Sequence, residues 1–235
     1  MTKGILITIA LALAPAVAFA QTPKAATYIT DEEVKAVNAT PGVDRTIRVV
    51  DIGNENFAVG IIHRVATGGG RGTGAGAGGG AARGGANAAA GGGAGRGAAG
   101  GGGRAAGAPA PVPCGEQATP PPAGGTPGGI AHDSQTEGYL IVSGGGTLVT
   151  GGRIANGNKS AADAPVTKEL NGPSCSGMII GSDVVKRVVK TGDIIIIPAG
   201  VPHGWTDIGD HVDYLSFRPS DHVLTAGYVH PAIKK

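Results

Sequence analysis

The chain has 235 residues, 45 of them glycine, and a formal net charge of only +2. So small a charge gives no electrostatic reason to expect nucleic acid or an anionic membrane surface as a partner. More than half of the glycines lie between residues 68 and 129, where little apolar surface is available for burial. The composition therefore favours one folded domain over two.

The first 20 residues have the layout of a secretory signal peptide. Lys3 precedes an apolar run from Ile5 to Phe19, and Ala18 and Ala20 fit the small-residue cleavage motif. A retained anchor is the alternative, but the run is shorter than the about 20 residues that a spanning helix needs. We expect cleavage after Ala20 and a secreted or periplasmic protein, with no membrane contact after cleavage.

Residues 21–44 are expected to form an N-terminal segment with one short helix. Thr30 and Glu33 have the spacing of a capping box, which predicts a helix that continues to about Ala39. Pro41 and Gly42 follow and stop it.

Residues 45–66 are expected to contain the first two strands, at 45–51 and 57–65, because β-branched and aromatic residues recur there between turn signals. In the second strand, alternation places His63 on the same face as Phe57, Val59 and Ile61. We expect this apolar face, and with it His63, to point into the interior.

Residues 67–129 are interpreted as a disordered Gly/Ala/Pro-rich insertion, since they lack apolar periodicity. Scattered arginines suggest a second interpretation, a segment that binds RNA or polyanionic polysaccharide. These arginines are Arg71, Arg83, Arg96 and Arg104. An exported protein rarely meets RNA, so we adopt the linker interpretation.

Residues 130–220 are expected to form a β core. Strand signals recur at 139–142, 147–150, 177–180, 184–189, 193–197 and 211–218. We expect a tight turn at 143–146, an irregular loop at 151–165 and a weakly patterned tail at 221–235. Many short strands with almost no helix indicate a closed or double-sheet all-β fold.

The stretch from Gly192 to His203 predicts a strand that delivers a histidine. Its four consecutive isoleucines, 194–197, favour a short strand buried on both faces. Pro198 and Gly200 fit the second and fourth positions of a type I turn. The spacing of Gly192, Pro198, Gly200 and His203 resembles the second motif of the cupin superfamily of small β-barrels.

A match to the first cupin motif lies upstream. His132, Glu137 and Gly144 have the spacing of its His, Glu and Gly positions. Ile130 stands where the family usually has another histidine, and Asp207 stands at its terminal asparagine. The chain thus resembles a single-domain, exported, cupin-2-like protein, which implies a cupin-type β-barrel or jelly roll.

The resemblance implies that His132, Glu137 and His203 are metal ligands. Imidazole and carboxylate together suit a divalent transition metal such as Fe, Mn, Zn, Ni or Cu, and two histidines with one carboxylate form a competent site. A barrel that has lost its metal and kept these residues as a polar cluster is the alternative, because Ile130 replaces a ligand.

Other residues are candidates for ligand binding. His63 is a candidate replacement ligand or a core histidine, and Trp205 and Tyr139 could stack on a sugar or aromatic ligand. Arg64 and Arg218 could bind a substrate carboxylate, although a solvated charge at a strand end is the commoner role.

The implied function is an exported cupin that binds a metal and a small polar metabolite, with oxygenase- or isomerase-type catalysis left open. The alternative is a non-enzymatic cupin that binds carbohydrate or another small molecule without metal. Cupins often pair as dimers, so the resemblance also allows a homodimer.

Cys114 and Cys175 are the only cysteines. In a chain expected to reach an oxidising compartment, we predict that they form a disulfide.

Overall fold

The computed structural model describes residues 25–67 and 111–234. The predicted signal peptide, residues 68–110 of the predicted insertion and the four scattered arginines lie outside these ranges. Within them, no helix has the length and apolarity required to cross a membrane.

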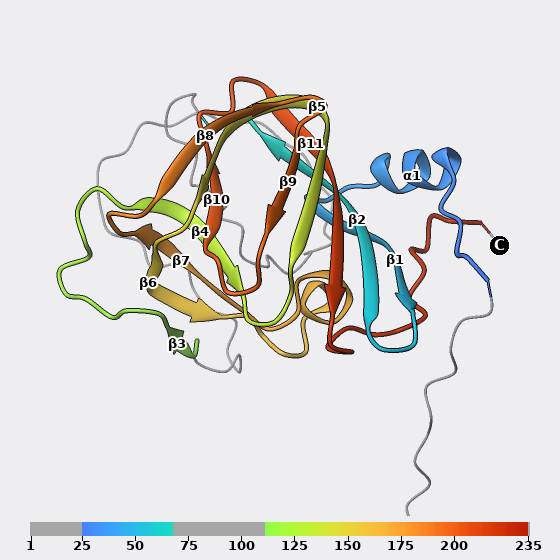
Figure 1. Ribbon diagram of the computed structural model, residues 1–235, viewed down its shortest axis with the longest axis horizontal. Coiled ribbons are helices and arrows are strands. Elements are labelled where there is room, and N and C mark those ends of the chain that lie inside the picture. Colours follow the sequence, from blue (N-terminus) through green and yellow to red (C-terminus); the bar gives the residue numbers. More distant parts are fainter. Residues whose placement is uncertain (1–24, 68–110, 235) are drawn as a thin grey trace, which may run out of the picture.

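The described chain is an all-β molecule with one α-helix at its edge (Figure 1). Its elements are α1 (Asp31–Asn38), β1 (Asp44–Asp51), β2 (Asn56–Val65), β3 (Pro113–Cys114), β4 (Thr126–His132), β5 (Glu137–Thr150), β6 (Arg153–Lys159), the π-helix η1 (Thr167–Asn171), β7 (Ser174–Ile180), β8 (Val185–Lys190), β9 (Ile194–Ile197), β10 (His203–Thr206) and β11 (His211–Ser220). The predicted all-β architecture with a short N-terminal helix is confirmed, including both hydrogen bonds of the Thr30–Glu33 capping box.

The strands form two layers that share β5. One layer has the order β1-β2-β11-β5-β9, and the other has the order β8-β5-β10-β4-β7-β6-β3. The first half of β5 pairs with β9 and β11, and its second half pairs with β8 and β10. Side chains of both layers, among them Ile62, Tyr214, Leu148 and Val189, meet in one apolar core.

The hairpin turn predicted at residues 143–146 is wrong, because β5 runs through them without reversing (Figure 1). Gly144 has a φ of +68°, and a Cβ there would lie 2.0 Å from the carbonyl oxygen of His211. The glycines therefore allow a bend and a close approach inside one long strand, where they had been interpreted as a turn.

The isoleucine strand β9 is an edge strand, not one buried on both faces. Within the described chain it pairs only with β5, and Ile194 and Ile196 are each 73% exposed. Ile197 is buried in the core.

Residues 111–129, which the sequence analysis assigned to the insertion, belong to the folded part of the chain. They contain β3 and the first half of β4, and β3 pairs with β6. Strand β6 lies within the loop that was expected at 151–165. Cys114 in β3 and Cys175 in β7 form the predicted disulfide, with Cα atoms 5.9 Å apart.

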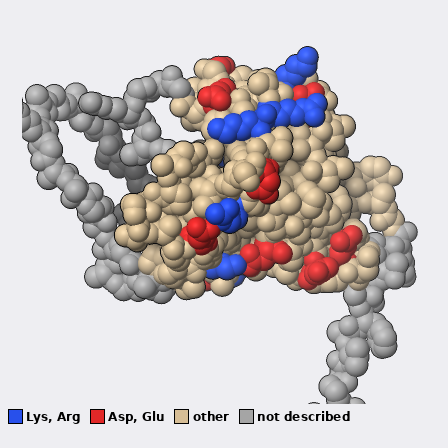
Figure 2. Space-filling view, turned by 60° about the vertical axis from the view of Figure 1, so that its left-hand side comes forward, with Lys and Arg blue, Asp and Glu red and all other residues tan. Residues whose placement is uncertain are grey.

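The outer face of the first layer is covered by α1 and the C-terminal tail. Val37 of α1, Ile61 of β2 and Ile233 of the tail pack in a second apolar cluster. The tail residues 221–234 thus contribute to packing despite their weak pattern. On the face viewed in Figure 2, acidic and basic side chains are interspersed over a surface that is mostly uncharged.

Candidate metal centre

Two ligand candidates flank the connection between β4 and β5. His132 is the last residue of β4 and Glu137 is the first residue of β5. The short loop between them lets each side chain project inward from its own strand, as the motif spacing implies.

The third candidate, His203, begins β10 after the loop that follows β9. The amide of Val201 donates to the carbonyl of Pro198, and Gly200 has a φ of +78°. Pro198 and Gly200 therefore occupy the first and third positions of the turn, and the positive φ fits type II, not the type I turn that was predicted. Gly200 also donates its N–H to the carbonyl of His132, which ties this loop to the end of β4.

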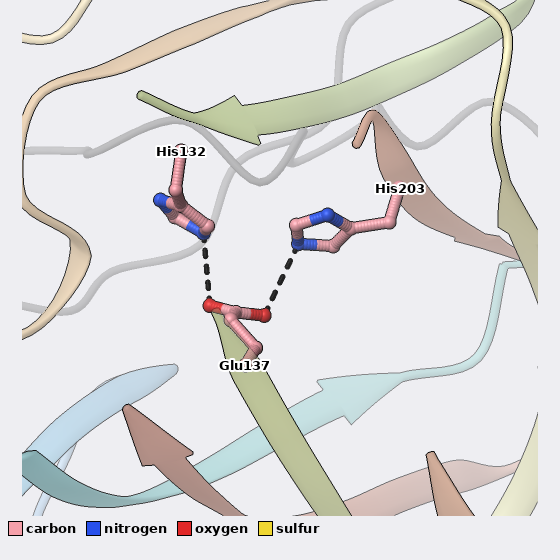
Figure 3. Close-up of side chains that lie close together, drawn as sticks. All are labelled: His132, Glu137 and His203. Carbon is pink, nitrogen blue, oxygen red and sulfur yellow. Dashed lines mark ion pairs between the residues drawn. The ribbon is translucent and has the colours of Figure 1, made fainter. Parts of the chain in front are cut away.

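The three side chains converge in the interior (Figure 3). Glu137 Oε1 lies 2.9 Å from His132 Nε2, and its Oε2 lies 3.2 Å from His203 Nε2. One ligand atom from each residue lies within 4.8 Å of the other two, and all three residues are buried. This group could hold a metal ion.

Backbone carbonyls fix the orientation of both imidazoles. His132 Nδ1 lies 2.7 Å from the carbonyl oxygen of Asn171, and His203 Nδ1 lies 3.0 Å from that of Val201. A carbonyl oxygen only accepts, so each Nδ1 carries the proton and donates it. In a neutral ring, each Nε2 then presents a lone pair toward Glu137.

A second contact on His132 agrees with this tautomer. Ser174 Oγ lies 2.8 Å from His132 Nδ1 and donates its own proton toward the carbonyls of Asn171 and Gly172. The hydroxyl is thus available as an acceptor for Nδ1–H. Burial lowers the pKa of His132, which favours the neutral ring.

Two further side chains, those of Arg218 and Tyr139, contact the carboxylate of Glu137. Arg218 Nη2 lies 2.5 Å from its Oε1, and the hydroxyl of Tyr139 donates to its Oε2. Complete burial opposes ionisation, but the positive charge of Arg218 outweighs it and holds the pKa of Glu137 well below its usual range. The site therefore contains an ionised carboxylate.

The three side chains are of the chemical types that bind a metal cation. Two imidazole lone pairs and a carboxylate converge on one point, and all three are acceptors. A divalent transition metal satisfies such a set, and three ligands leave coordination positions open.

Three other residues that the sequence analysis singled out lie at the metal centre. Ile130, Tyr139 and Trp205 line the same small cavity as His132 and His203. Ile130 is the cross-strand partner of His203, so it faces the cavity from the position of the missing ligand. Tyr139 is only 2% exposed and its ring packs on Tyr214 at a centroid distance of 4.3 Å, which leaves it no free face for stacking.

His63 does not reach the cavity. The apolar face that it shares lies under α1 and the tail, and the opposite face of β2, with Ile62 and Arg64, faces the interior. His63 Nδ1 contacts Asp213 Oδ1 at 2.6 Å on the outer side of the layer. The alternation of β2 was predicted correctly, but the wrong face was assigned to the interior.

Arg218 was predicted to bind a substrate carboxylate or to be a solvated charge, and the structure instead pairs it with Glu137. Asn171 and Ser174 were not singled out from the sequence. Arg218 is 3% exposed and also donates to Asn171 Oδ1 and Ser216 Oγ. The burial of Arg218 could have been inferred from the alternation in β11, because the even-numbered positions from Val212 to Arg218 point inward.

The sequence matches no family model and no curated protein. Two solved structures are similar in part. One is from a study of the mechanism of oxalate oxidase, with 12% identity over 78% of this chain, a TM-score of 0.27, and 54% of that chain's length covered. The other is peruvianin-I, a cysteine peptidase from Thevetia peruviana latex, with 9% identity over 82% of this chain and 76% of that chain, and a TM-score of 0.29. Likenesses this low assign no activity to the chain.

Proposed function

We propose that the chain is a cupin-type protein that binds one divalent transition metal ion through His132, Glu137 and His203, and a small polar ligand beside it. The observation that carries the proposal is the convergence of His132 Nε2 and His203 Nε2 on the buried carboxylate of Glu137, at 2.9 and 3.2 Å. The two cupin-like motifs supply these three residues in the required order.

The protein's own groups hold this arrangement before any ion binds. The carbonyls of Asn171 and Val201 orient the imidazoles, and Arg218 and Tyr139 orient the carboxylate. Such outer contacts fix the tautomer and position of metal ligands in proteins. A bound ion would supply Lewis acidity toward a ligand oxygen, or O₂ activation if the metal is redox-active.

Export to the periplasm or out of the cell is also a proposal, and it rests on residues 1–20. The metal-free, carbohydrate-binding alternative is weakened by the burial of Tyr139, which was one of its two stacking residues. Catalysis of the oxygenase or isomerase type remains a further proposal, as does a homodimer.

Metal content tests the proposal. Full-length protein loaded with Zn²⁺, Mn²⁺ or Fe²⁺ and then desalted is expected to retain about one ion per chain by elemental analysis. His203→Ala is expected to lose it, because two ligands remain. His211→Ala is the matched control, since this histidine is partly exposed on the outer face and contacts Ser143 and Asp210.

Ile130→His supplies a second arm, since it would add a fourth ligand from a position that already faces the cavity. We expect it to tighten binding. If wild type takes up no ion and Ile130→His does, the barrel has lost an ancestral site and the proposal is wrong. If neither binds, the polar cluster is purely structural.

A further inference from the structure

The isoleucine strand β9 has one free edge. Residues of an antiparallel strand direct their backbone groups alternately to one side and to the other. The amide of Ile141 in β5 donates to the carbonyl of Asp193, so Asp193 and, two residues on, Ile195 direct theirs toward β5. Ile194 and Ile196 therefore direct their N–H and C=O groups away from β5, to a side on which no described strand lies.

The side chains of the same two isoleucines are also uncovered. Ile195 and Ile197 turn toward the apolar core, whereas Ile194 and Ile196 on the opposite face are each 73% exposed. Val142, on this outer face of β5, is 40% exposed. An apolar strand edge that is open in both its backbone and its side chains is a template for a further strand.

Two other edges of the sheet are protected. The C-terminal tail covers the edge of β1, because it exchanges backbone hydrogen bonds with Ile47 and Val49. Strand β8 precedes β9 on the same side of β5 and contains Lys186, Arg187 and Lys190. Covering segments and cationic side chains are common protections of an edge strand. Strand β9 has neither a covering segment among the described residues nor a charged side chain.

We propose that β9 pairs with β9 of a second copy of the chain, antiparallel across a two-fold axis, so that the two first layers join into one sheet. A strand that pairs with its own copy brings like residues together. Such pairing would place cations beside cations along β8, but it places only isoleucines beside isoleucines along β9. Both copies use the same edge, so the association closes at two chains.

The small size of the contact predicts a weak dimer. It extends along four residues, and Pro198, which follows them, has no N–H to continue the ladder. Stable complexes bury about 1,200–2,000 Å² in total, and a contact along one short strand lies at or below the lower end of this range. We expect a Kd between about 1 µM and 1 mM. This inference is independent of the proposed metal site and gives the proposed homodimer a defined interface.

Sedimentation equilibrium of the full-length protein, at concentrations from about 1 µM to 1 mM, measures the association. We expect a monomer–dimer equilibrium without larger species. Ile196→Lys should weaken it about tenfold or more, because each copy then brings a charge into an apolar contact. Val188→Lys is the matched control, since it makes a similar change at a side chain of β8 that is 77% exposed. It should leave the Kd unchanged.

Amide hydrogen exchange distinguishes strand pairing from contact through side chains alone. In the proposed dimer the amides of Ile194 and Ile196 become hydrogen-bonded, so their exchange should slow as the protein concentration rises through the Kd. The amide of Ile195 donates to β5 in monomer and dimer alike, and its exchange should not show this dependence.

Three results would overturn the inference. A monomer at every concentration would leave an extended peptide of another protein as the strand that fits this edge. Association that Ile196→Lys and Val188→Lys weaken equally would not be specific to β9. A dimer in which the amides of Ile194 and Ile196 still exchange rapidly would be held by side chains, without strand pairing.

Discussion

Arg218 shows how one residue stabilises a buried acidic group. Its guanidinium contacts Glu137 Oε1, Asn171 Oδ1 and Ser216 Oγ, and it has almost no contact with water. An ionised carboxylate with no exposed surface requires such a partner, because desolvation would otherwise favour its protonated form.

Arg218→Met is therefore expected to destabilise the metal-free protein by about 3–5 kcal/mol, since it leaves Glu137 as an unpaired buried charge. Urea unfolding after chelation measures this loss. Adding Glu137→Gln should recover much of it, because the charge that lacked a partner is removed.

The matched control is Arg153→Met, which breaks the exposed pair between Arg153 and Glu116. An exposed pair such as this contributes little to stability, because solvent and salt screen it. If Arg218→Met costs no more than this control, the buried pair does not stabilise the fold.

At the scale of elements, the disulfide joins the short edge strand β3 to β7 within the second layer, beside the metal centre. Cys175 is the cross-strand partner of Ala131, and the neighbouring pair is His132 with Ser174. Strand β3 has only two residues and pairs only with β6 among the described strands. The covalent link therefore ties to β7 a segment that is otherwise hydrogen-bonded mainly to β6.

Replacing both cysteines by alanine is expected to cost about 4 kcal/mol, from the loop of 61 residues that the bridge closes in the unfolded chain. Denaturant titration measures this difference. Wild type unfolded under reducing conditions should show the same reduced stability, and reductant should not affect the variant. An unchanged midpoint on reduction would contradict the role assigned to the bridge.

At the scale of the whole molecule, the sequence predicted the fold class, most strand positions and the convergence of His132, Glu137 and His203. These follow from local signals: alternation, turn residues and motif spacing. The role of Gly144 could not be predicted in this way, because a glycine triplet between apolar runs is typical of a turn and equally permits a bend within one strand.

The sequence also could not predict which layer covers which face. His63 and Arg64 are adjacent, and alternation shows only that they point in opposite directions. Whether the apolar face of β2 meets the other layer or meets α1 depends on contacts between residues far apart in the chain, such as Ile61 with Ile233. The burial of Arg218 likewise depends on which face of its strand meets the other layer.

Strand β5 belongs to both layers and pairs with four other strands, β8, β9, β10 and β11. If any one of these neighbouring strands separates from β5, most of the β5 amides keep their hydrogen bonds to the strand on the other side. Its amide protons are therefore expected to exchange with deuterated solvent only when the whole molecule unfolds, at the full free energy of unfolding. In β1, which pairs with β2 alone among the named strands, exchange should be faster through partial opening. Exchange in β5 as fast as in β1 would show that the two layers open independently, and that the ligands from β4, β5 and β10 are not held by one cooperative unit.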